Sequence, residues 1–144
     1  MFPFKVKFTN KLKTNINSDK EDSFFKFIEE QMSNEGADFY SRGKHSLNIE
    51  NKLFSLKFNW GLMVPVDSGI IEIYEKDNQK KLKYVITFYR LWIISALFSI
   101  LIFLTGETIL GALIAFGLLG LGNWLFAIIR HIGFFNELKR YLRN

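Results

Sequence analysis

Histidines and carboxylates are the side chains of this chain that could carry acid–base or metal chemistry. The sequence holds two histidines, His45 and His131, and no cysteine. Thiolate metal sites, disulfides and a cysteine nucleophile are therefore excluded. The two histidines lie far apart in the sequence, and neither has a carboxylate at the spacing of a metal-ligand pair. We predict no metal site and no cofactor.

The remaining reactive patterns fit a surface better than an active site. The segment Gly36–His45 holds a Gly-Lys pair, but six residues intervene between its glycines and His follows the Lys, where a Walker loop needs four residues and Ser or Thr. We interpret it as a surface turn. The acidic groups Glu29-Glu30 and Asp19, Glu21 and Asp22 fit the solvated side of a helix. The pattern therefore predicts a protein that is not an enzyme.

An uncharged stretch from Ile109 to Ile129 indicates where the protein resides, and only Asn123 in it is strongly polar. A helix of this length covers about 30 Å, the hydrocarbon thickness of a bilayer. The shorter uncharged run Leu91–Leu104 ends four residues before it. We predict a two-helix transmembrane hairpin over residues 90–130, with spans at about 91–105 and 109–129.

Small residues on both predicted spans favour close packing of the two helices, since in lipid tight backbone approach drives association. Asn123 is expected to bond between helices, with a polar path as the alternative. Frequent glycine in membrane helices is the competing explanation of the small residues. The residues predicted to pack the helices are Ser95, Ser99, Gly111, Ala115, Gly122 and Asn123.

Charge distribution gives the orientation of the hairpin. Arg90 precedes the first span and Arg130 follows the second, whereas Glu107 is the only charged residue in the sequence of the connecting loop. The positive-inside rule then places both termini in the cytoplasm, and the amino terminus lacks a signal peptide. The richness in Asn, Lys, Ile and Phe is typical of a protein from an AT-rich bacterial genome. Together these features predict a multi-pass protein of the bacterial inner membrane.

The tail, residues 131–144, is predicted to form a short basic amphipathic helix on the anionic inner leaflet. Its apolar face holds Phe135, Leu138 and Leu142. Trp92 and Trp124 fit an interfacial aromatic belt, and His131 an interfacial position. The predicted membrane-surface residues are Arg90, Trp92, Arg130, Lys139, Arg140 and Arg143.

Residues 1–89 are predicted to form a cytosolic α+β domain. Alternation at a period of two indicates strands near residues 4–9, 47–49, 54–60, 69–75 and 82–89. The inward face of the last strand is expected to hold Leu82, Tyr84, Ile86 and Phe88. Ser18 and Glu21 fit a capping box that opens a helix bearing Phe24, Phe27, Ile28 and Met32 on one face. The expected order is β-α-β-β-β-β, one helix on a roughly five-stranded antiparallel sheet.

These patterns favour a non-catalytic accessory, scaffold or adaptor subunit whose cytosolic domain binds a protein partner or a second copy. Mixed charge in the soluble part argues against nucleic acid as the partner. The alternative is a lipid or other apolar small molecule held between helix and sheet. The side chains that could line such a ligand or partner surface are Phe24, Phe27, Phe58, Trp60, Tyr84 and Phe88. A membrane enzyme is the third hypothesis, which requires His45 in a cleft with carboxylates.

Overall fold

The computed structural model describes residues 4–12, 16–35, 37–51, 62, 65–106 and 108–143. The fold is mixed α+β, as predicted. The elements follow the order β1 (Lys5–Lys11), α1 (Ser18–Asn34), β2 (Phe39–Arg42), β3 (Ser46–Glu50), β4 (Ser68–Lys76), β5 (Gln79–Thr87), α2 (Tyr89–Leu104), α3 (Ile109–Phe116), the π-helical η1 (Gly117–Gly122) and α4 (Asn123–Arg143).

The strands form one five-stranded antiparallel sheet in the order β1-β5-β4-β3-β2. Asp77 and Asn78 join β4 to β5 with φ values of 58° and 55°. Asp and Asn tolerate this left-handed conformation, which a tight two-residue hairpin turn requires. The hairpin predicted here is present, with a shorter turn than the expected residues 76–81.

One strand differs from the expectation although the predicted element order is observed. Residues 39–42 form β2, within the segment that the sequence assigned to a surface turn. Phe39 and Tyr40 are good strand formers, but the strand is too short for its alternation to be recognised. The strand predicted over residues 54–60 lies outside the described residues.

Helix α1 begins one residue earlier than the capping box predicted. The side chain of Asn17 accepts a hydrogen bond from the Lys20 amide at 3.1 Å, so Asn17 is the cap and Ser18 the first helical residue. The fully buried face of the helix holds Phe24, Phe25, Ile28 and Met32, whereas Phe27 is only half-buried.

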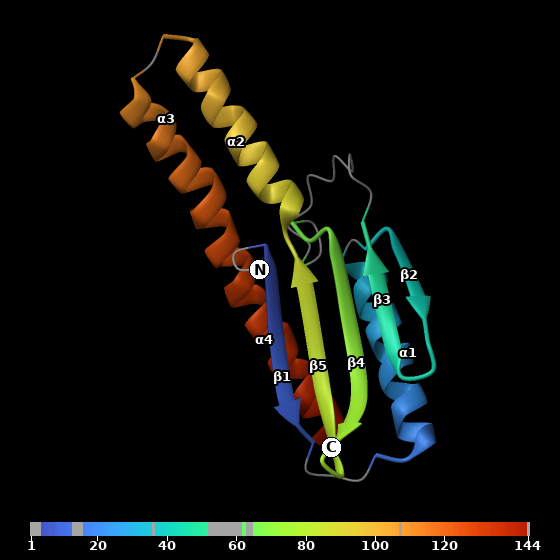
Figure 1. Ribbon diagram of the computed structural model, residues 1–144. Helices are drawn as coiled ribbons and strands as arrows, with labels where there is room; N and C mark the ends of the chain where they lie inside the picture. The colour runs from blue at the N-terminus through green and yellow to red at the C-terminus, as the bar shows by residue number, and fades with distance from the viewer. Residues whose placement is uncertain are drawn as a thin grey trace.

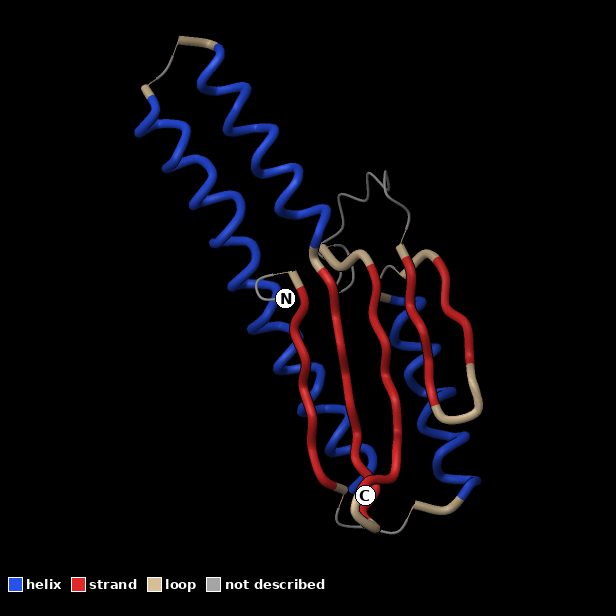
Figure 2. Tube along the Cα trace, viewed as in Figure 1, coloured by secondary structure: helices blue, strands red, loops and turns tan. Residues whose placement is uncertain are grey.

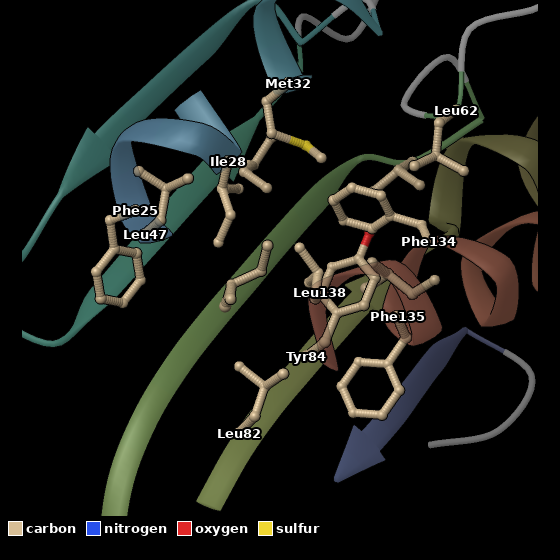
Figure 3. Packing of buried hydrophobic residues seen from close by; sticks show 14 of the residues in the cluster. Phe25, Ile28, Met32, Leu47, Leu62, Leu82, Tyr84, Phe134, Phe135 and Leu138 are labelled. Carbon is tan, nitrogen blue, oxygen red and sulfur yellow. The ribbon is translucent and has the colours of Figure 1, made fainter. Parts of the chain in front are cut away.

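Helices α1 and α4 cover the same face of the sheet, and α2 and α3 project beyond its end as an antiparallel pair (Figures 1 and 2). The core fills the space between the sheet and these two helices. Phe134, Phe135 and Leu138 of α4 gather around Tyr84 of β5, and Ile28 and Met32 of α1 lie over the neighbouring strands (Figure 3). The predicted inward face of β5, from Leu82 to Phe88, is buried as expected.

The C-terminal tail is part of this core, which corrects the prediction of a separate interfacial helix. Residues 131–143 continue α4 without a break, and the apolar side chains expected to face lipid are buried against the sheet. Phe135 stacks on Phe8 of β1 with ring centroids 5.6 Å apart. An amphipathic helix fits a membrane surface and a sheet equally well, so the sequence pattern could not distinguish the two. The C-terminal end of α4, whose sequence holds Lys139, Arg140 and Arg143, lies at the end of the fold opposite the helical pair (Figure 1).

One continuous helix, Ile109–Arg143, is long and apolar enough to cross a membrane by length and composition. Helix α2 is apolar but shorter. Helix α2 packs along the α3 and η1 segments of this long helix.

Truncation of the buried C-terminal face should destabilise the whole domain. Leu138 is fully buried, so we expect Leu138→Ala to lower the free energy of unfolding by about 2–4 kcal/mol. The exposed neighbour Arg140→Ala should change it by less than about 0.5 kcal/mol. Urea titration in mild detergent, followed by tryptophan fluorescence, measures both. Equal stability of the two variants would mean that the tail does not belong to the core.

Candidate functional site at the base of the helical pair

The base of the helical pair is the place where α2 leaves β5 and where α4 joins the sheet. A single residue, Phe88, separates β5 from α2, and its side chain is fully buried. The Phe88 amide also donates to the Phe4 carbonyl at 2.8 Å, which extends the pairing of β1 with β5. The sheet therefore passes into α2 with no flexible linker.

Asp67 caps α2 from outside the helix. The preceding residue Phe88 supplies no side-chain cap, and the Arg90 amide instead donates to Asp67 Oδ2 at 2.9 Å. The Arg90 guanidinium also pairs with Asp67, with Nε 3.3 Å from Oδ1, and it donates to the Val66 carbonyl. A carboxylate at a helix N-terminus interacts favourably with the helix dipole. Arg90, predicted as a membrane-surface cation, is thus mostly buried in a contact within the fold.

Asn51 and Glu35 join further segments at this base. The Asn51 side chain accepts from the Asp38 amide at 2.9 Å and donates to the Val66 carbonyl at 2.7 Å. Glu35, just after α1, accepts from the Leu62 amide at 2.7 Å. The same Glu35 oxygen lies 3.8 Å from the guanidinium of Arg130 on α4.

Tyr84 and His131 connect the centre of the sheet to the long helix. The Tyr84 hydroxyl and His131 Nδ1 form a hydrogen bond of 2.8 Å, and both side chains are fully buried. The predicted interfacial position of His131 is therefore wrong. Its side chain points inward, one helical turn before Phe134 and Phe135, and a single histidine beside an arginine gives no sign of this in the sequence.

Burial controls the protonation of this pair, which belongs to the domain and lies below the predicted span 109–129. Burial lowers the pKa of His131 to about 3, and the positive charge of Arg130 also lowers it. The Leu62 backbone acts in the opposite direction and raises the pKa. Burial also raises the pKa of the Tyr84 hydroxyl. The pair is therefore neutral at physiological pH and joins the helix to the sheet as an uncharged contact.

Two tryptophans close the base of the pair instead of forming an exposed belt. Trp92 lies between Trp124 and Phe116, with ring centroids at 6.4 and 5.8 Å, and Trp92 and Trp124 are both nearly fully buried. A Cβ built on Gly120 would lie 3.2 Å from the Trp92 ring. Because Gly120 lacks a Cβ, η1 approaches Trp92 closely. Among the described residues, Trp92 Nε1 has no hydrogen-bond partner.

The small residues of the helical pair are distributed differently from the prediction. Ser95 and Ser99 are buried and donate to carbonyls one turn earlier in α2, whereas Gly111 and Ala115 are half-buried. A side chain at Gly122 would meet nothing within 4 Å, so Gly122 makes no close contact within this chain, and its predicted helix packing stays a prediction. Asn123 donates to the Leu119 carbonyl of its own helix at 2.8 Å and forms no described bond between helices. The π-helical turn shifts the facing positions, and Gly120 takes the contact.

The predicted apolar ligand surface is packed core in the described part of the chain. Phe24, Tyr84 and Phe88 are fully buried in one continuous cluster. Phe27 stacks on Tyr141 of α4 with ring centroids 4.5 Å apart. Phe58 and Trp60 lie outside the described residues.

His45 approaches one carboxylate, that of Glu21, whereas the enzyme hypothesis required several carboxylates around it in a cleft. Its Nδ1 lies 2.6 Å from the nearly buried carboxylate of Glu21, and Lys80 Nζ lies 4.0 Å from the other Glu21 oxygen. Lys80 also donates to the Ile16 carbonyl at 2.6 Å. Because the Glu21 carboxylate contacts the His45 ring on one side and the Lys80 ammonium on the other, this cluster resembles a structural polar network that holds the start of α1. Within the described residues no group of three or more potential metal ligands gathers.

Removal of the Asp67 carboxylate should loosen the first turn of α2. We expect Asp67→Ala to lower the free energy of unfolding by about 1–2 kcal/mol, since it removes a helix cap and the partner of Arg90. Asp67→Asn should retain much of the cap and lose the ion pair. Hydrogen exchange of the amides from Arg90 to Ile93 should accelerate most in the alanine variant. Unchanged exchange there, compared with the control Glu75→Ala, would contradict the capping role.

The His131 contact predicts that stability falls in mild acid. The unfolded chain binds a proton at a histidine near pH 6.5, but the folded chain does so only near pH 3, so the unfolded state gains protons first. Lowering the pH from 7.5 to about 5.5 should remove on the order of 1 kcal/mol of stability. His131→Gln should flatten this part of the profile. Parallel profiles for the two proteins in urea titrations would disprove the assignment.

Comparison with protein-family models, with curated proteins and with solved structures gives no match to this chain. No activity, ligand or partner of a known family therefore transfers to it.

Proposed function

We propose that the protein is a non-catalytic membrane-anchored accessory, scaffold or adaptor subunit. In this proposal α2 and the helix from Ile109 to about Ile129 cross the bilayer as a hairpin. The α+β domain lies on the cytoplasmic side and binds a protein partner. The observation that carries the proposal is an apolar helical pair whose two ends return to one domain core.

The apolar surface of the pair supports a lipid environment. Large hydrophobic side chains remain exposed along both helices, many of them by more than half of their surface. Soluble monomers rarely expose continuous apolar patches of more than a few hundred Å². The exposed set is Ile93, Ile94, Leu97, Phe98, Ile100, Leu101, Phe103, Leu104, Ile109, Leu110, Leu113, Ile114, Leu118, Leu119, Leu121, Leu125, Phe126 and Ile129.

The topology of the core supports two crossings instead of one. Strand β5 enters α2, and α4 packs on the same sheet, so the chain before and after the pair lies in one hydrophobic core. These two parts must be on the same side of any membrane. A single crossing by the long helix would separate them, whereas a hairpin returns the chain to its starting side.

The charge distribution supports a cytoplasmic domain. Arg90 and Arg130 lie at the base of the pair, whereas the sequence of the connecting turn holds Glu107 and no basic residue. Basic residues are enriched on the cytoplasmic side of membrane helices. The base of the pair is therefore the end expected on the cytoplasmic side of a bacterial membrane.

Among the described residues no helix lies on the second face of the sheet, and this uncovered face is the surface that we assign to the partner. Helices α1 and α4 both lie on the opposite face (Figure 1). On this face Ile70 pairs with Val85 across the strands, and Ile70 is 40% exposed whereas Val85 is buried. Lys83 and Glu72 form an ion pair of 2.7 Å beside them. A small apolar centre with a polar rim is typical of a protein-binding surface.

The tight packing of Phe24, Tyr84 and Phe88 favours this function over the alternative of a lipid held between helix and sheet. A ligand there would have to displace core side chains that are fully buried. The direct connection of β5 to α2 adds a reason for an accessory role, since a partner on the sheet would be held at a fixed orientation to the hairpin.

The hairpin can be tested by cysteine labelling, because the natural chain contains no cysteine. We expect Thr9→Cys and Arg140→Cys to react with a membrane-impermeant maleimide from one side of the bilayer, and Thr105→Cys only from the other. All three positions are exposed in the fold. Labelling of Thr9→Cys and Arg140→Cys from opposite sides would contradict the hairpin.

The partner surface can be tested by crosslinking in native membranes followed by mass spectrometry. A photoreactive group at Asn48 or Ile70 of the uncovered face should give a defined adduct with another protein or a second copy. Ile70→Glu should reduce this adduct several-fold, while the matched exposed control Glu75→Lys leaves the fold intact. No adduct from either position, with the protein correctly inserted, would contradict partner binding at this face.

A further inference from the structure

The outer face of the long helix stays apolar beyond the level at which α2 begins. Leu125, Phe126, Ile129 and Ile132 are 53%, 52%, 66% and 44% exposed, respectively. They lie on the side of α4 opposite His131 and Leu138, which face the sheet. Farther along the same outer face, the exposed side chains become polar at Asn136, Arg140 and Arg143.

The two legs of the pair therefore carry apolar surfaces of different length. Helix α2, Tyr89–Leu104, has 16 residues and covers about 24 Å. The exposed apolar stripe on the other leg runs from Ile109 to Ile132 and covers about 36 Å at the same rise. The hydrocarbon core of a bilayer is about 30 Å thick. If the pair runs parallel to the bilayer normal, α2 is shorter than the hydrocarbon core, and the lower end of the apolar stripe on the other leg is exposed to water.

A tilt accommodates the longer leg, because an apolar stripe longer than the hydrocarbon core fits it when inclined to the bilayer normal. Contacts fix the relative height of the helices, because Gly120 of η1 lies beside Trp92 of α2. In antiparallel helices Tyr89 then lies near the height of Asn123, and Ile132 lies roughly 13 Å farther from the tip of the pair. Leaning the domain toward the bilayer on the α4 side brings the stretch from Leu125 to Ile132 to the bilayer surface. The shorter leg is accommodated by local thinning of the bilayer, at a modest cost per Å of mismatch.

We infer that the α4 flank of the α+β domain, defined by Leu125, Phe126, Ile129 and Ile132, is embedded in the lipid interface of the membrane. This inference rests on the proposed membrane location of the pair. The domain then leans on the bilayer along α4, and the water boundary falls between Ile132 and Asn136. The uncovered face of the sheet, on the side away from α4, remains open to the cytoplasm.

The flank is apolar where a surface in the cytoplasm would be polar, and nothing in the fold covers it among the described residues. Its continuity with the exposed stripe of α3 and η1 favours lipid over a second copy as the occupant. Interfacial segments of this kind lie about 5–10 Å deep, at the boundary of headgroups and acyl chains. That depth is of the same order as the extra length of the long leg.

Spin labels on single cysteines test the position of the flank in the full chain, reconstituted into phosphatidylethanolamine and phosphatidylglycerol vesicles. Labels replace Leu113 in the hairpin, Ile129 and Ile132 in the flank, and Asn136 and Arg140 below it. Relaxation by dissolved oxygen reports lipid exposure, and relaxation by a water-soluble nickel chelate reports aqueous exposure. Circular dichroism confirms that each labelled variant is folded, and all five positions are exposed.

We expect the labels at Leu113, Ile129 and Ile132 to respond more to oxygen, and those at Asn136 and Arg140 more to nickel. Nickel-dominated labels at both Ile129 and Ile132, with Leu113 still in lipid, would overturn the flank and leave the hairpin intact. An aqueous Leu113 would overturn the membrane proposal itself. Flank labels shielded from both reagents, with spin–spin broadening at full labelling, would also overturn the inference, because a second copy would then cover the flank.

Discussion

Packing of the C-terminal part of α4 against the sheet is the constraint on which the rest of the structure depends. The sheet formed by the first part of the chain is covered on one face by two helices, and one of them comes from the last twenty residues. Leu138 and Leu142 fill the same core as Phe24 and Ile28. Removing α4 would leave Tyr84 and much of β5 open to water, so neither part of the chain completes a core alone.

The base of the helical pair converts this packing into a rigid joint. Asp67 holds the start of α2, Glu35 links the end of α1 to α4, and Tyr84 bonds to His131 inside the core. The Asp67 and Tyr84 contacts are short and at least partly buried, the Glu35 contact is longer and more exposed, and together they join five separate segments. Gly120 allows the tryptophans to close above them. The orientation of the pair relative to the sheet is therefore determined by side chains, and not only by chain connectivity.

Local patterns in the sequence predicted the fold well where the pattern has one physical meaning. Alternation at a period of two identified the strands around Ile71 and Tyr84, and helical spacing identified the buried face at Phe24 and Met32. The tail pattern has two meanings, because Leu138 and Leu142 can face either lipid or a sheet. Long-range contacts such as Asp67 with Arg90 leave no local signal. The candidate site at the base of the pair could therefore be recognised only after the elements were placed in space.

The division of the core between the two ends of the chain has a consequence for biosynthesis. A ribosome that has made the first ninety residues has produced a sheet whose apolar face is covered by α1 alone, and the second covering helix, α4, emerges only after α2 and α3. In the proposed membrane topology, the domain can close only when those helices have returned the carboxyl end to the compartment that holds the amino end. Insertion and completion of the water-facing fold would then be a single event, and a chain inserted in the wrong topology would leave the sheet incompletely covered and open to proteolysis.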